Sequence, residues 1–490
     1  MADVQQKMAR GIIWMVAARL MDRSIGVVST LILARLLVPG DFGLVAMATA
    51  IGGVLDLLGA FSFELALIQN QQAGRSEYDT VWTFNVLFGL FCALALVGLA
   101  WPAAVFYNEP RLSAVMCALA LAYLFGGLSN VGVVNFRKDL NFRDEFRLLF
   151  LRRIVTFGAT VGGALWFHSY WALVTGIIVG RIVGVIASFR MSDYRPRLSL
   201  SASRELFHFS KWLFLNNTFQ FLQGNGCNFI IAKLYGATGV GIFSVAYEIS
   251  NLPSTELVAP INRATFPGFS KMADPALISA SYLKLMGMIG LLILPVGLGI
   301  AAVADPLVRA VLGDKWLDAV PLIQLLAVYG AITATQTNNS VVWMVMGRTR
   351  EVTIMTAFFL LILGPGLYYF LGRYGVIGAG YAYLLAHVPT VPVAMRLTRG
   401  MLGFRWRDLS AVLWRPTLAV LVMYTSVRGF DLHLAAHNPW VRLFVESAFG
   451  AVVYMGVSLV LWQVAGRPQG AESFCLGKVS ARLKLGGQHG

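Results

Sequence analysis

Apolar stretches of about 20 residues alternate with short polar connections along nearly the whole chain. Residues 291–303, for example, form an uninterrupted apolar run. About 20 apolar residues span a bilayer as a helix, whereas barrel strands alternate between apolar and polar positions. The pattern therefore predicts an all-α polytopic membrane protein with about fourteen transmembrane helices, near residues 11–36, 42–68, 80–106, 112–135, 147–167, 171–189, 207–235, 239–262, 281–303, 319–346, 353–372, 376–396, 409–428 and 440–465.

An internal repeat divides these predicted helices into two sets. Residues 33–48 end one predicted helix and open the next, and a similar pattern returns at residues 231–246. Aligned without a gap, the two stretches match Ala34 with Ala232, Arg35 with Lys233, Leu36 with Leu234, and Gly43 with Gly241. A gapless match of this kind indicates duplication. Because the two sets start six helices apart, they share one orientation and form parallel repeats.

The repeat gives a domain prediction for the whole chain. We expect two six-helix lobes, two additional helices and a polar cytoplasmic tail, at residues 1–200, 201–400, 401–466 and 467–490. No connection is long enough for a folded extramembrane domain, so function is expected within the membrane.

Composition and charge support the membrane class. Hydrophobic residues make up 57% of the 490 residues and charged residues only 13%, about half the share of a soluble protein. The net charge of +15 comes from basic residues between the apolar stretches, without a cluster that would suit nucleic acid. Most of them fall on one side if both termini are cytoplasmic, as the positive-inside rule requires.

The sequence shows no arrangement of residues typical of catalysis, metal binding or a cofactor. The four cysteines lack ligand spacing, and the histidines are scattered. We therefore expect no catalytic residues, no metal site and no cofactor.

Four charged residues lie deep inside predicted helices, where each charge costs about 2.5–3.5 kcal/mol. Arg19, Asp22 and Arg23 share one face of the first helix, and Arg181 lies midway along the sixth. One interpretation is an internal Arg–Asp pair that holds helices together. The other is that Arg19, Arg23 and Arg181 form the cationic wall of a cavity for a pyrophosphate. Arg152 and Arg153 are near the start of a helix, where they are expected to reach the cytoplasmic surface.

Acidic and amide side chains also interrupt the apolar helices. Asp22, Asp56, Glu64 and Glu248 could pair with the arginines or carry a coupling ion. Amides in membrane helices usually form interhelical hydrogen bonds. Facing a cavity, they would also suit sugar hydroxyls, and the candidates are Asn217, Gln220, Asn338 and Asn339.

Short motifs make the chain similar to a known group. They are ARLLVPGDFGLVAMA at 34–48, ELALIQ at 64–69, TVWTF at 80–84 and FRKDLNF at 136–142. With fourteen predicted helices in two parallel lobes, the chain resembles bacterial polysaccharide repeat-unit flippases of the multidrug/oligosaccharidyl-lipid/polysaccharide exporter superfamily.

The resemblance implies a transporter that alternates between inward- and outward-open states in the inner membrane. Its implied substrate is an undecaprenyl-pyrophosphate-linked oligosaccharide for exopolysaccharide, capsule or O-antigen synthesis. Polysaccharide polymerase and chain-length or export proteins are implied partners. Two alternatives stay open: a cation-coupled drug or metabolite antiporter on the same scaffold, or a membrane polysaccharide polymerase or ligase.

Overall fold

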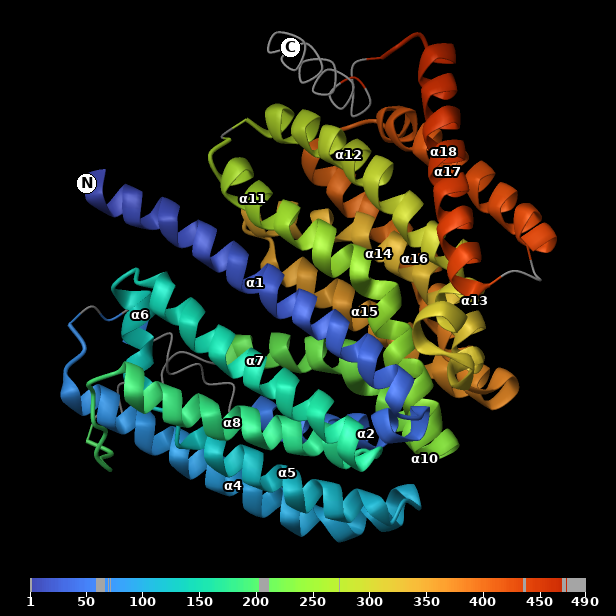
Figure 1. Ribbon diagram of the computed structural model, residues 1–490. Helices are drawn as coiled ribbons and strands as arrows, with labels where there is room; N and C mark the ends of the chain where they lie inside the picture. Colours follow the sequence, from blue (N-terminus) through green and yellow to red (C-terminus); the bar gives the residue numbers. More distant parts are fainter. Residues whose placement is uncertain are drawn as a thin grey trace, which may run out of the picture. The chain divides into compact units, whose positions relative to one another are not determined.

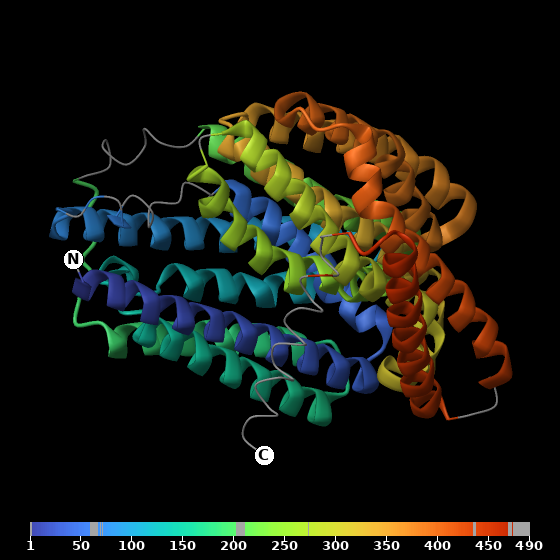
Figure 2. The ribbon, with the colours of Figure 1, turned by 90° about the horizontal axis from the view of Figure 1, so that it is seen from above.

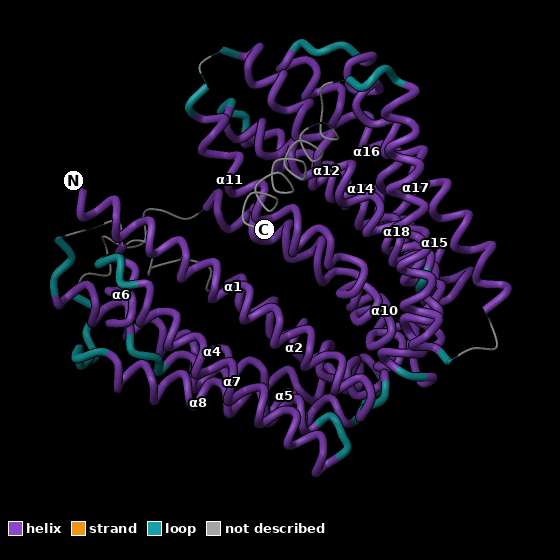
Figure 3. Tube along the Cα trace, turned by 45° about the horizontal axis from the view of Figure 1, so that its top comes forward, coloured by secondary structure: helices purple, strands orange, loops and turns teal. Residues whose placement is uncertain are grey.

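The structure is a computed structural model, and every element in the part of the chain that it describes is helical (Figure 3). The described residues are 2–58, 67–68, 70, 72–201, 211–272, 274–434, 438–468 and 473. Over these residues the all-α prediction is confirmed. The chain divides into two compact units, Met1–Ser244 and Val245–Gly490, each of which is described by itself.

The first unit contains long helices joined by short connections (Figure 1). Helix α4 packs along α5, and α7 packs along both α1 and α8. The elements are α1 (Ala2–Leu36), α2 (Pro39–Leu58), α4 (Arg75–Tyr107), α5 (Arg111–Gly127), a 3₁₀ turn (Val131–Val134), α6 (Asn135–Lys138), α7 (Phe142–Phe167), α8 (Trp171–Met191) and most of α10 (Lys211–Leu252).

The second unit starts within α10 and contains the remaining helices (Figure 2). Here α12 packs against α14 and α17, and α15 packs against α16. The elements after α10 are a π-helical turn (Pro253–Val258), α11 (Ala259–Ser270), α12 (Pro275–Ala302), α13 (Ala304–Leu307), two short turns (Val308–Leu312 and Asp314–Ala319), α14 (Val320–Val345), α15 (Thr349–Tyr374), a 3₁₀ turn (Gly375–Ile377), α16 (Gly378–Leu402), α17 (Trp406–Leu434) and α18 (Pro439–Val464).

Ten helical segments of the described chain are long and apolar enough to cross a membrane, or eleven if one bent pair is counted. Two of the ten contain an internal break: Thr218–Val258 at Gly236, and Thr349–Leu402 at Gly375. The chain is therefore a polytopic helical membrane protein, and the number fourteen stays a prediction.

The predicted helix at 112–135 is bent rather than continuous. Helix α5 stops at Gly127, and the following helical segment Val131–Lys138 turns away by 66°. The cause is local, because the Asn130 carboxamide caps the next turn: its Oδ1 accepts from the Gly132 nitrogen at 2.9 Å. Its Nδ2 donates to the Tyr194 carbonyl oxygen at 2.7 Å.

Helix α10 breaks at the position that the repeat predicts. Gly236 has φ 63° and ψ −163°, a conformation that favours glycine, and it aligns with Val38 between α1 and α2. Close to this break, the aligned residues Gly43 and Gly241 make a reciprocal contact. A Cβ on Gly43 would overlap the Ala237 carbonyl oxygen, and a Cβ on Gly241 would overlap the Pro39 carbonyl oxygen. Pro39 and Ala237 are themselves aligned, so the repeated segments touch through equivalent atoms.

The segment after α8 is fastened to α4 by hydrogen bonds. Asp79 accepts from the Tyr194 hydroxyl, and its Oδ1 also accepts from the Arg197 nitrogen at 2.8 Å. One turn further along α4, Thr83 Oγ1 accepts from the Ser199 nitrogen at 2.9 Å. Burial raises the pKa of the Tyr194 phenol well above its usual value, and the hydrogen bond to Asp79 adds to the effect. We call residues 192–199 the strap.

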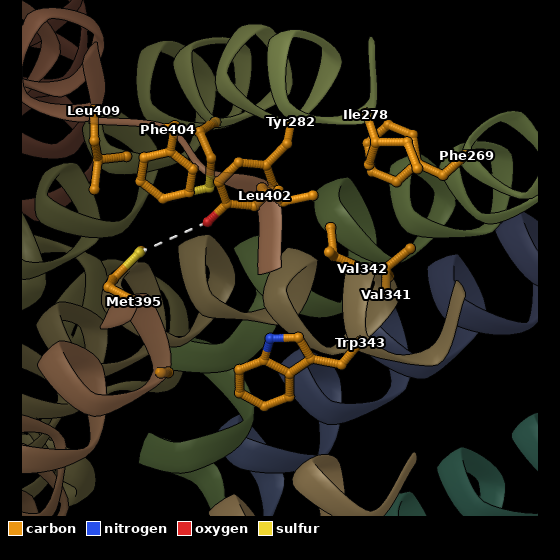
Figure 4. Packing of buried hydrophobic residues seen from close by; sticks show 12 residues of the cluster. Phe269, Ile278, Tyr282, Val341, Val342, Trp343, Met395, Leu402, Phe404 and Leu409 are labelled. Carbon is orange, nitrogen blue, oxygen red and sulfur yellow. Dashed lines mark hydrogen bonds between the residues drawn. The ribbon is translucent and has the colours of Figure 1, made fainter. Parts of the chain in front are cut away.

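A polar network lies within the apolar core of the second unit. Tyr282 of α12 donates to Asn339 Oδ1 at 2.6 Å, and Thr398 of α16 donates to the same oxygen at 3.1 Å. Trp343 Nε1 in turn donates to Thr398 at 3.0 Å. Figure 4 shows Tyr282, Trp343 and Met395 among the surrounding apolar side chains. This network joins α12, α14 and α16 through satisfied buried groups.

Candidate functional site

The predicted arginines of the first unit are accompanied by charged side chains from neighbouring helices. Helix α1 carries Arg19, Asp22 and Arg23. Helix α7 packs against α1 and α8 packs against α7, and both carry further arginines. The complete set is Arg19, Asp22, Arg23, Asp56, Arg152, Arg153 and Arg181, and we call it the charged set. It contains five guanidinium groups and two carboxylates.

Asp22 forms an ion pair with Arg153. The distance from Arg153 Nε to Asp22 Oδ1 is 3.2 Å, and the Asp22 side chain is 62% exposed. The Arg153 guanidinium lies against Gly26 of α1, since a Cβ there would come within 2.5 Å of Nη2. The expectation that Arg153 extends to the cytoplasmic surface stays a prediction; the structure adds that an acidic residue of the adjacent helix pairs with it.

Arg181 lies where α8 faces α5. A Cβ on Gly126 would be 3.6 Å from Arg181 Nη1, so the small residue makes room for the guanidinium. Arg181 interacts electrostatically with Asp56 and with Arg152. The Tyr123 hydroxyl donates to Asp56 Oδ2 at 2.9 Å. Asp56 thus accepts a hydrogen bond from Tyr123 and is attracted electrostatically by Arg181.

An open cavity of about 510 Å³ lies between α2 and the first part of α10. Asp56 and Gln220, both predicted as site residues, line it together. The remaining lining residues are Thr49, Gly53, Leu57, Phe221 and Asn225. A carboxylate, a hydroxyl and two amides around one cavity can form hydrogen bonds with a polar ligand.

The structure places the other predicted residues elsewhere. Glu64 and the side chain of Asn217 lie outside the described part of the chain. Glu248 is half-buried in the second unit. Asn338 and Asn339 are fully enclosed, at 0% and 1% exposure, and Asn339 belongs to the polar network. Their contact with sugar stays a prediction, because neither side chain is accessible to a ligand in this conformation.

Three site residues were missed or misjudged from the sequence. Asn225 continues the row of amides around Gln220, so the same signal could have included it. Tyr123 lies in an apolar helix and gives no signal of its own. Arg153 was noticed, but helix spacing alone could not show that its partner is Asp22 on another helix.

Comparisons with known proteins agree with this reading of the fold. The chain is 25% identical to the lipopolysaccharide biosynthesis protein WzxC of Escherichia coli, over 84% of this chain and 85% of that protein. It is 23% identical to the succinoglycan biosynthesis transport protein ExoT of Rhizobium meliloti, over 91% of each. Among solved structures, lipid II flippase MurJ in an inward closed conformation matches with a TM-score of 0.69 and 13% identity, covering 93% of this chain and all of that one.

A family model described as "Polysaccharide biosynthesis protein" matches residues 32–321, more than half of the chain. The resemblance that the motifs at 34–48, 64–69, 80–84 and 136–142 indicated is thereby confirmed. The chain belongs to the polysaccharide biosynthesis protein family.

Proposed function

We propose that the chain is a flippase that moves undecaprenyl-pyrophosphate-linked oligosaccharide repeat units across the bacterial inner membrane for polysaccharide synthesis. Both termini lie in the cytoplasm, and the substrate passes from the cytoplasmic to the periplasmic leaflet by alternating access. The family, the relatives named for polysaccharide synthesis and transport, and the flippase-like fold support this proposal.

The observation that carries the proposal is the excess of arginine in the charged set. Arg153 pairs with Asp22 and Arg181 acts on Asp56, and helices α1 and α7 carry three further arginines, Arg19, Arg23 and Arg152. Such an excess is costly within a membrane unless an anion offsets it. Arginine can hold two phosphate oxygens with parallel hydrogen bonds, so a pyrophosphate diester suits this set.

The cavity beside Asp56 suits the sugar part of the same substrate. Gln220, Asn225 and Thr49 offer donors and acceptors for hydroxyl groups. Asp56 lies both in this cavity and within the field of Arg181, so pyrophosphate and sugar would occupy adjoining regions. The isoprenoid tail needs no polar partner and would stay in the bilayer.

One feature favours the second candidate, a cation-coupled antiporter. Asp56 is exposed to the cavity and carries a negative charge that could hold a cation instead of a sugar. In a deletion strain, an antiporter would leave lipid-linked repeat units at their normal level, whereas a missing flippase would make them accumulate.

Replacing Arg181 by glutamine is expected to abolish polymer export, because one phosphate-binding guanidinium is lost. Arg181→Lys should impair export less, since lysine keeps the charge but cannot form the bidentate contact. Export is measured as polymer per cell in a deletion strain that carries each variant at equal membrane abundance. Lipid-linked repeat units should accumulate on the inner leaflet.

Arg190→Gln is the matched control, because Arg190 is an exposed residue at the end of the same helix α8. It should export polymer at the wild-type rate. Wild-type export by Arg181→Gln would mean that Arg181 only balances Asp56, and the pyrophosphate site would be wrong.

Replacing Asp22 by asparagine is expected to cost little stability, about 1 kcal/mol or less, because its ion pair with Arg153 is largely exposed. Transport per molecule should persist, since the positive charge of the set rises by one. The measurement is export divided by membrane abundance, together with the Arg153→Gln and double variants to isolate the pair. Loss of transport at normal abundance would instead assign Asp22 to ion coupling.

A further inference from the structure

A second group of charges lies in the other unit, where α13, α17 and α18 meet. At its centre is Arg442 of α18, whose side chain is 7% exposed. Three carboxylates surround it: Arg442 Nη2 is 3.1 Å from Asp305 Oδ2 and contacts Asp431 Oδ1, and Nε is 3.4 Å from Glu446 Oε1. The proposed function involves none of these residues.

The six oxygens of these three carboxylates differ in whether a guanidinium group lies next to them. Arg309 Nε lies 3.0 Å from Asp305 Oδ1, and Arg428 Nη1 lies 3.9 Å from Asp431 Oδ2. With the Arg442 contacts, five of the six oxygens face a guanidinium. The sixth, Glu446 Oε2, is buried and has no hydrogen-bond partner.

Glu446 is also the most deeply buried member of the group. Its side chain has 0% exposure and lines a cavity of about 400 Å³ between α12, α17 and α18. The other lining residues are apolar apart from Ser447 and Tyr454, and the Tyr454 hydroxyl donates to the Leu291 carbonyl oxygen at 2.8 Å. A carboxylate oxygen without a partner in such surroundings is costly, whereas a neutral carboxylic acid is much less so.

The distribution of charge points the same way. The junction holds three carboxylates, Asp305, Asp431 and Glu446, and three guanidinium groups, Arg309, Arg428 and Arg442. Arg309 and Arg428 are 37% and 42% exposed, so solvent screens their charges, and the buried Glu446 depends on Arg442, which all three carboxylates share. The groups that act on Glu446 directly are Arg442, on its own helix, and Asp431 of α17. The cavity residues contributed by α12 carry no titratable group.

We propose that Glu446 is a proton-binding site within the membrane. Its carboxyl carries the proton on Oε2, beside the Asp431 carboxylate. Taking up the proton from solvent changes the charge of the junction by one unit. A metal ion is a poorer occupant, because five of the six oxygens already face arginines and no metal-binding group occurs among the described residues.

Infrared difference spectroscopy on the purified full-length protein tests this directly. A pH jump from neutral to alkaline should remove a carboxylic-acid C=O absorption from the wild-type spectrum. Glu446→Gln should lose that signal, and Glu351→Gln should keep it, since Glu351 is the partially exposed partner of Arg348 in an ordinary ion pair. A wild-type spectrum without the signal, or an unchanged one in Glu446→Gln, overturns the proposal.

Two further outcomes keep the test decisive. Glutamine has the shape of the neutral acid, so failure of Glu446→Gln to fold would also contradict the proposal. Asp431→Asn removes the negative group beside Glu446, so the same signal should disappear at a lower pH than in the wild type. An unshifted signal in that variant would assign the proton elsewhere. None of these readouts depends on transport.

Discussion

Replacing Gly43 by alanine is expected to prevent normal folding of the first unit. The added Cβ would overlap the Ala237 carbonyl oxygen and come within 2.7 Å of the Gly241 nitrogen. Backbone atoms inside helices cannot rotate aside as a side chain can, so α2 and α10 would have to separate. Overpacking of this kind costs about 1–3 kcal/mol, and more where backbone must move. Fluorescence-detected size-exclusion of a tagged variant would show the loss of monodisperse protein.

Gly241→Ala should have the same effect as Gly43→Ala, because the contact is reciprocal. Gly226→Ala in the same helix α10 is the control, since nothing lies within 4 Å of a Cβ at that position. Alanine there should gain about 0.5–1 kcal/mol from its higher helix propensity. Normal yield and thermal stability in both Gly43→Ala and Gly241→Ala would show that the helices need no such close approach.

Replacing Asp79 by alanine is expected to release the strap from α4. The Tyr194 hydroxyl and the Arg197 nitrogen would both lose their acceptor, and Asp79 is only 6% exposed. Hydrogen bonds to a charged group contribute about 1.5–3 kcal/mol each, so we expect a loss of about 2–4 kcal/mol. The thermal midpoint should fall. With the strap on the cytoplasmic side, as the proposed topology has it, a protease added to inside-out vesicles should cut it faster.

Asp144→Ala offers a matched control for this change. Asp144 is the partly exposed acid of an ion pair with Arg147 at the start of α7, so its loss should cost well under 1 kcal/mol. If Asp79→Ala leaves both the midpoint and the cleavage rate at wild-type values, the strap is held by other contacts, such as that of Asn130 with Tyr194.

Much of the fold was predictable because lipid imposes a simple rule on the sequence. Every crossing needs a continuous apolar helix, so the apolar runs gave the helices directly. The repeat alignment of Gly43 with Gly241 also predicted where α10 breaks, at Gly236. The bend after Gly127 was not foreseen, because it depends on a single asparagine cap within an apolar stretch.

The pairing of charges was harder to predict than their positions. Helix periodicity shows which residues share a face of one helix, but not which neighbouring helix that face meets. The sequence therefore left the partner of Asp22 open, and the structure shows an ion pair with Arg153 of α7. The sequence carries no signal for Glu446 or Asp431, since Glu446 lies alone in an apolar run and Asp431 lies near the end of a helix. Their significance depends on Arg442, which brings three helices' carboxylates together.

The reciprocal contact between residues 39–43 and 237–241 has an evolutionary consequence. In a two-fold homodimer, a residue of one subunit touches a second residue of its partner, and the same pair recurs with the subunits exchanged. The glycine contact has this form within one polypeptide. Fusion of two copies of an ancestral gene whose product formed such a dimer would leave a contact of this form. In a homodimer, one mutation changes both copies of a position. In the fused chain, Gly43 and Gly241 mutate separately, so a larger residue at either position alone meets the unchanged backbone of the other segment.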